Sequence, residues 1–244
     1  LFTIQGKGEG RHRLKELSEA YLTLAKLLSA IALSNLWDAT AEKACIVRKG
    51  YREDLRHFMQ WSPATGSKTD YFFLVQTVNC IFQENGIEPY VTELLALNDQ
   101  TNMEYFNAHR FMEQELRQRL LANNIPYQEV ESLCYESELH LGELFKQAAF
   151  LCNYQLVSVK SIAVDLPRKE PQPTFVHQKA ILKGRDYATI DVEPMRRDDT
   201  SSNNSVFITR NLEEEGLPLN LSPFLIDQNA YKAKKQYLPK IYFF

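Results

Sequence analysis

Apolar residues follow two different periods along the chain. From about residue 10 to 153 they recur at steps of three and four, which is typical of helices packed on one face. From about residue 154 to 244 they form short alternating runs separated by polar turns, which is typical of strands. Because helices come first and strands follow, the pattern predicts an α+β fold. We expect an antiparallel bundle of five or six helices over 1–153 and a small antiparallel β-sheet or barrel over 154–244.

The first helix has the most regular pattern. Six large residues step by 3, 4, 3, 4 and 3, so they share one seam of a helix that we expect to end near Trp37 and Asp38. Smaller apolar residues widen this seam into a face, which favours a bundle over a bare coiled coil. The seam residues are Leu14, Leu17, Tyr21, Leu24, Leu28 and Ile31.

Further elements follow from turn and cap signals. Gly86 marks the end of one apolar helix, and Thr101 or Asn102 can cap the start of another. Pro167, Pro171 and Pro173 predict an extended linker. We expect helices over 51–61, 71–82, 89–97, 101–124 and 131–152. We expect strands over 162–166, 174–182, 187–192, 206–209, 217–221, 223–226 and 241–244, with a polar hairpin loop over 196–205.

Composition narrows the class of protein. The 244 residues are 44% hydrophobic and 24% charged, which excludes a collagen-like repeat, a disulfide-rich mini-protein and a wholly disordered chain. The net charge of −3 weighs against broad nucleic-acid binding, and acidic residues are mixed into most of the basic clusters. Nucleic acid is therefore a possible partner that we do not favour.

The cysteines and the hydropathy point to a compartment. The four cysteines form no C-x-x-C pair and stand beside apolar residues, which favours buried reduced thiols in a cytoplasmic protein. No apolar run reaches the length of about 18 residues that a membrane helix needs, so we expect no membrane partner. The first residue is Leu1 rather than methionine, which suggests an excised domain and a possible flanking domain as partner.

Common catalytic motifs are absent, including the phosphate-binding G-x-x-x-x-G-K-[ST] and the metal-binding H-E-x-x-H. Arg52 and His57 fit the pattern R-x-x-x-x-H, which resembles the motif of the HEPN ribonucleases, small helical bundles of bacterial defence and toxin systems. The resemblance implies that Arg52 stabilises charge on the scissile phosphate and that His57 is the general acid or base. That family usually has Asn, Asp or His after the arginine, whereas this chain has Glu53.

A second set of polar residues raises the question of a metal. Glu136, His140 and Glu143 are spaced by four and three, which places them on one face of a helix. One imidazole between two carboxylates can bind a divalent ion. Di-iron bundles need a matching motif on a second helix, and the sequence has none. A salt-bridged surface histidine is the favoured interpretation, so we expect no metal and no cofactor.

The last part of the chain carries a further resemblance. Val206–Thr209, the acidic turn before Gly216, the run Leu217–Ile226 and the aromatic end Ile241–Phe244 resemble a β module that terminates many bacterial signalling and defence proteins. The resemblance implies a sensing, regulatory or docking role. We therefore expect a non-enzymatic regulatory or protein-interaction module. The alternatives are a metal-independent HEPN-like endoribonuclease, whose site could complete across a homodimer seam, and a small-ligand sensor with a pocket between bundle and sheet.

Overall fold

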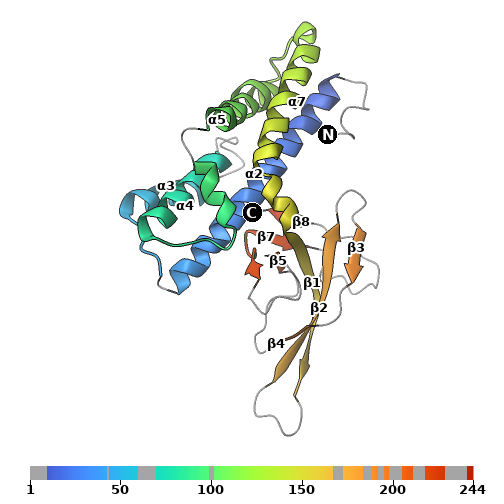
Figure 1. Ribbon diagram of the computed structural model, residues 1–244. Helices are drawn as coiled ribbons and strands as arrows, with labels where there is room; N and C mark the ends of the chain where they lie inside the picture. The colour runs from blue at the N-terminus through green and yellow to red at the C-terminus, as the bar shows by residue number, and fades with distance from the viewer. Residues whose placement is uncertain are drawn as a thin grey trace. The chain divides into compact units, whose positions relative to one another are not determined.

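The computed structural model describes residues 10–42, 44–59, 70–98, 102–166, 173–183, 188–191, 195–197, 205–210, 218–228 and 241–243. Two compact units are present (Figure 1). The first unit contains the chain up to Ala32 together with Ala39–Leu151, and the second contains Leu33–Asp38 together with Cys152–Phe244. Helices dominate the first unit and antiparallel strands the second, so the predicted α+β class is confirmed.

Helix α2 (Gly10–Ala41) is the longest element of the described chain and contributes to both units. All six residues of the predicted seam are buried, and Leu14, Leu17 and Ile31 have no exposed surface at all. Serine also lies on the buried side, where Ser29 Oγ is 2.8 Å from Ala25 O and 3.1 Å from Tyr71 O. The helix continues to Ala41, three residues beyond the predicted end.

We predicted that no segment is long and apolar enough to cross a membrane, and helix α2 differs from this prediction in its length and composition. Its most apolar 18-residue window has a mean hydropathy of 1.3, so by length and composition it could span a bilayer. Within the protein, however, 67% of that window is buried against other residues. A core helix of a bundle has this property, because its apolar surface is already covered. Cytoplasmic location stays a prediction.

Helices α3 (Lys49–Met59) and α4 (Tyr71–Asn85) follow, and they differ strongly in burial. No residue of α3 is buried, whereas α4 buries eight residues. Asp70 caps α4 by accepting a hydrogen bond from Phe73 N, and Gly86 ends it at φ 65°, as predicted from the glycine. The helix predicted over 89–97 is a 3₁₀ helix, η2 (Thr92–Asn98), which begins three residues after Pro89.

The next helix changes its winding. It begins as α5 (Met103–Arg110), capped by Asn102 as predicted, continues as a π-helix, η3 (Phe111–Gln118), and ends as α6 (Arg119–Leu121). The wider π turn shifts which side chains face the core and is frequent at functional sites. Periodicity predicted a helix here but gave no sign of the π segment.

Helix α7 (Val130–Gln147) completes the bundle, between the 3₁₀ turns η4 (Tyr127–Glu129) and η5 (Ala149–Asn153). It packs on α5 and η3 and lies beside α2, where Arg13 pairs with Glu138 at 2.6 Å (Figure 1). Six residues of α7 are buried, namely Val130, Leu133, Cys134, Ser137, Leu141 and Leu144. On the opposite side of the helix, Tyr135 and Leu139 are exposed.

The second unit is built on an antiparallel sheet with the strand order β3-β2-β1-β5-β6, in which β4 also pairs with β2. A separate ribbon joins β7 and β8. The described strands form an open sheet rather than the alternative of a barrel. Their bounds are β1 (Gln155–Asp165), β2 (Thr174–Lys183), β3 (Ala188–Asp191), β4 (Met195–Arg197), β5 (Val206–Thr209), β6 (Leu219–Asn220), β7 (Leu225–Asp227) and β8 (Ile241–Phe243).

Two features of this unit depend on side chains. The buried Asp227 of β7 accepts a hydrogen bond of 2.8 Å from Ser158 of β1, which ties the ribbon to the sheet. Trp37, in the last part of α2, packs edge-on against Phe224, with 6.1 Å between the ring centroids. The predicted linker over 167–173 and the loop over 196–205 lie mainly outside the described residues.

The four cysteines are all free thiols. Cys45 and Cys134 are buried and Cys80 is half-buried, as their apolar neighbours predict, but Cys152 is exposed. Burial raises the pKa of the Cys45 and Cys134 thiols, which keeps both protonated and unreactive.

Candidate functional site

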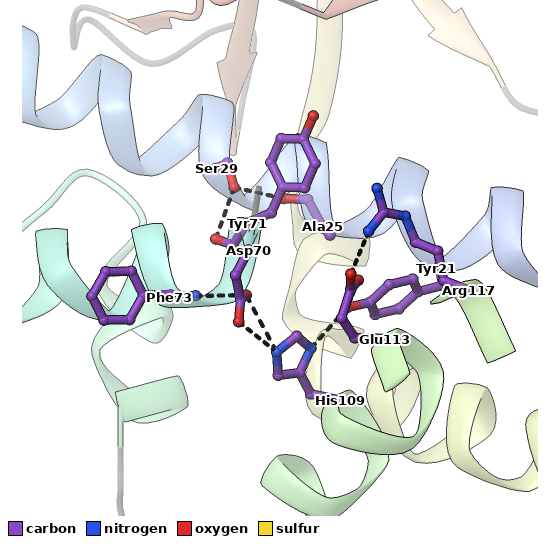
Figure 2. A network of polar contacts seen from close by, with 9 residues as sticks. All are labelled: Tyr21, Ala25, Ser29, Asp70, Tyr71, Phe73, His109, Glu113 and Arg117. Carbon is purple, nitrogen blue, oxygen red and sulfur yellow. Dashed lines mark hydrogen bonds and ion pairs between the residues drawn. The ribbon is translucent and has the colours of Figure 1, made fainter. Parts of the chain in front are cut away.

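A polar network crosses the interior of the helical unit (Figure 2). It runs from Asp70 through His109, Tyr21 and Glu113 to Arg117, and so connects the start of α4 with α5, α2 and η3. Tyr21 and Arg117 are almost wholly buried, whereas Asp70 keeps 43% of its side chain exposed. Asp70 is therefore the point at which the network meets solvent.

The histidine is held on both ring nitrogens. His109 Nε2 lies 3.3 Å from Asp70 Oδ1 and 3.4 Å from Oδ2, and Nδ1 lies 2.8 Å from the Tyr21 hydroxyl. The imidazole also packs on the Phe72 ring at 4.3 Å between centroids, while Tyr21 stacks on Phe72 at 5.8 Å. These aromatic contacts fix the plane of the ring, so its two polar contacts keep their directions.

The other half of the network is an ion pair. The Tyr21 hydroxyl lies 3.3 Å from Glu113 Oε2, and the other oxygen of Glu113 accepts from Arg117 Nη1. Glu113 and Arg117 are four residues apart within the π-helix, and in Figure 2 the Arg117 guanidinium points to the Glu113 carboxylate. The arginine neutralises a carboxylate that would otherwise be buried next to an aromatic ring.

Counting protons shows two equivalent arrangements. Three contacts must each hold a proton: Asp70 to Nε2, Nδ1 to the phenol, and the phenol to Glu113. Either the imidazole carries two protons and the phenol donates to an ionised Glu113, or the imidazole carries one and Glu113 is protonated. Both arrangements contain the same number of protons, so they differ only by moving two protons along the chain. If the network loses one of these three protons, one of the three contacts consists of two acceptors with no proton between them.

The pKa values of the two carboxyl groups, Glu113 and Asp70, are shifted in opposite directions. Burial raises the pKa of Glu113, and the charge and hydrogen bond of Arg117 only partly offset this. Burial also acts to raise the pKa of Asp70, but the hydrogen bond and charge of His109, with the amides of Phe73 and Phe72, outweigh it and hold that pKa below its ordinary value. Burial raises the pKa of Tyr21 far above its ordinary value, so the phenol stays a proton donor.

These shifts predict how stability depends on pH. A raised pKa in the folded state means that folding favours the protonated group, so the contribution of Glu113 is lost as pH rises through its folded pKa. We expect wild type to lose stability relative to Glu113→Gln as pH increases above about 4.3, by at most about 1.4 kcal/mol per pH unit. The measurement is urea unfolding of both proteins across the pH range.

Asp70→Asn provides the matched control, because asparagine keeps the helix cap but not the charge. The lowered pKa of Asp70 contributes stability that is lost as pH falls, so wild type should gain stability relative to this variant as pH rises. Equal slopes for the two variants would contradict the assignment of opposite roles.

The sequence contained partial signs of the network. His109, Glu113 and Arg117 are spaced by four, which places them on one face beside the core residues Met112 and Leu116. His109 could therefore have been singled out as a polar residue on a buried face. Its partners could not, because Tyr21 and Asp70 come from distant segments and the π-helix changes the facing of Glu113.

The residues of the HEPN-like hypothesis lie elsewhere. Arg52 and His57 are both on α3 and both exposed, and Arg52 Nε donates to the carbonyl of Val47 at 2.8 Å. Five residues on an α-helix correspond to a rotation of about 140°, so the two side chains leave the helix in different directions. The structure gives no contact between them within the described chain, and the ribonuclease hypothesis stays a prediction.

The set of Glu136, His140 and Glu143 shows contacts of an ordinary surface. The His140 ring packs on Phe111 at 4.3 Å, and partial burial lowers its pKa. Glu143 accepts hydrogen bonds from Lys146 and Gln147. Among the described residues, no group of three acidic, histidine or cysteine side chains could hold a metal ion.

His140 also borders a surface hollow of about 380 Å³ within the bundle. The lining includes both charges and amides, contributed by Asn107, Arg110, Phe111, Gln114, Glu115 and His140. A small ligand could enter a space of this size. The hollow lies between α5–η3 and α7, whereas the sensor hypothesis placed its pocket between the helices and the sheet.

The outer side of α7 exposes large apolar side chains. Tyr135 is 63% and Leu139 57% exposed, and the two are one helical turn apart on the side opposite the buried row. Exposed apolar residues that adjoin one another are characteristic of binding surfaces, whereas single ones are common everywhere. We call the line Glu131, Tyr135, Leu139, Gly142 and Lys146 the outer row.

Comparison with known proteins adds no assignment to this geometry. No family model matches the chain, and neither the curated proteins nor the solved structures contain a significant match.

Proposed function

We propose that this chain is a non-enzymatic protein-interaction module that binds its partner through the outer row of α7. Exposed Tyr135 and Leu139 on a helix whose opposite side is fully packed are the observation that carries the proposal. Tyrosine and leucine side chains bury much apolar surface in a contact, and a well-packed helix presents them without further ordering cost. A regulatory role in a bacterial signalling or defence system agrees with the resemblance of the C-terminal segment.

The buried network supports this proposal from another direction. Tyr21 and Arg117 are buried, and both contact Glu113, whose side chain is only 13% exposed. Networks of this kind fix the relative position of helices, because each member is costly to leave without its partner. Here the network joins α2, α4, α5 and η3, and α7 packs on α5 and η3. A rigid support for α7 is what an interaction surface requires.

Photocrosslinking in cells tests the proposal. A photoreactive phenylalanine placed at Leu139 should give discrete protein adducts, identified by mass spectrometry, and adding Tyr135→Glu should remove them by at least about tenfold. Ile46 provides the matched control, because its side chain is 74% exposed and its backbone is hydrogen-bonded to Asn85 at the end of α4, so the same group at that position should give no such adducts. Adducts at both positions, or none at Leu139, would overturn the proposal.

A further inference from the structure

The outer row forms a straight line along one side of α7. Its members are spaced by 4, 4, 3 and 4 residues, so they fall within a narrow strip of the helix surface. The strip runs from the acidic Glu131, over Tyr135 and Leu139, to the basic Lys146, a length of about 22 Å at 1.5 Å per residue. Charges of opposite sign therefore close the two ends of an apolar centre.

Gly142 lies in this strip, and its presence needs an explanation. Glycine in the interior of a helix costs about 1 kcal/mol relative to alanine. At Gly142 a Cβ atom would meet no atom of the described residues within 4 Å, so the packing described for this chain does not require its absence. The glycine leaves a notch in the exposed strip, next to Leu139. A close approach by another molecule is a physical reason for such a notch.

The strip is complementary to itself in only one orientation. In an antiparallel pair of α7 helices, Tyr135 can enter the notch at Gly142 of the other copy, and Glu131 can meet Lys146. Both pairs share one midpoint, between Glu138 and Leu139, so a single two-fold axis satisfies all four contacts and brings the two Leu139 side chains together. In a parallel pair, Glu131 would face Glu131 and Lys146 would face Lys146, which is unfavourable.

The end charges are available for such a contact. Glu131 is 84% and Lys146 70% exposed, and each has one ion-pair partner, Arg13 at 3.6 Å for Glu131 and Glu143 at 3.3 Å for Lys146. Exposed ion pairs contribute little and exchange easily, so both side chains can turn to a second copy. We propose, on the basis of the proposed interaction role, that the partner of the outer row is a second copy of this chain, bound antiparallel through α7.

Sedimentation equilibrium of the whole chain tests this inference. A single helix pair is smaller than a standard interface of about 800 Å² per partner, so we expect dimers with a dissociation constant on the order of 10 μM. Gly142→Ala should weaken the dimer by about tenfold while making the monomer more stable by up to about 1 kcal/mol. A weaker dimer together with a more stable monomer indicates that the notch is filled, whereas a damaged fold would lower the stability of the monomer as well. Ile46→Glu, away from the strip, should leave the dimer unchanged.

Charge reversal tests the orientation. Glu131→Lys and Lys146→Glu should each weaken the dimer, and the double variant should restore it, because the antiparallel pairs are reformed. In a parallel pair the double variant would stay weak. A chain that is monomeric at about 200 μM, far above the expected dissociation constant, would overturn the inference. In that case, adducts at Leu139 with a different protein would still support the proposed function.

Discussion

Arg117→Met should lower the free energy of unfolding by about 3–5 kcal/mol, because it leaves the largely buried carboxylate of Glu113 without a countercharge. Methionine fills much of the space of the aliphatic part of arginine, so the loss reports mainly on the ion pair. The measurement is equilibrium unfolding in urea at neutral pH. At acidic pH the loss should be smaller, since Glu113 can then bind a proton and its pKa is already raised by burial.

Two further variants sharpen this test. Arg110→Met, which removes an exposed arginine seven residues earlier in the same continuous helix, should change stability by no more than about 0.5 kcal/mol. Adding Glu113→Gln to Arg117→Met should recover part of the loss, because the buried charge is removed with its partner. A loss below about 1 kcal/mol for Arg117→Met would show that water or another group already satisfies Glu113.

Tyr21→Ala should have a loss of similar size, about 3–5 kcal/mol, by removing a large buried ring and the centre of the polar network together. The ring stacks on Phe72 and His109, and its hydroxyl links His109 to Glu113. Differential scanning calorimetry at several pH values would measure the loss.

Tyr21→Phe divides that effect into its two parts. It keeps the ring and removes only the hydroxyl, which leaves His109 Nδ1 and Glu113 Oε2 without their shared hydrogen-bond partner, at a cost of about 1–3 kcal/mol. The remainder of the alanine effect is then packing. If Tyr21→Phe were as stable as wild type, the hydroxyl would contribute nothing to holding α2 against α5 and η3.

The sequence was sufficient for elements whose structure depends on local pattern. The seam of α2, the glycine that ends α4 and the asparagine that caps α5 act through neighbours a few residues away, so their outcome was predicted. The strand over Val206–Thr209 was also predicted with its observed bounds, from its β-branched and aromatic residues and the polar residues beside it. Its pairing with β1 and β6 joins distant segments and was not predicted.

Features that depend on distant partners were not predicted. The sequence around Asp70 and around Tyr21 gives no sign that both contact His109. The Tyr21–His109 contact joins residues that are 88 apart in sequence. The π-helix over Phe111–Gln118 arises in a segment that reads as an ordinary helix, and only packing against the bundle reveals the difference. The exposed row on α7 was invisible for a related reason: periodicity identifies an apolar face, but burial decides which apolar residues stay in solvent.

Helix α2 has a practical consequence for anyone who wishes to produce the two units separately. A cut after Leu151 would seem to divide the chain at its natural boundary, yet the strand unit also includes Leu33–Asp38. A fragment starting at Cys152 would lose Trp37, which packs on Phe224, together with the buried Leu33 and Leu36. The strand-rich fragment is therefore best expressed with this short helical segment supplied in trans or fused to it, in the same way that a missing strand is returned to a split protein.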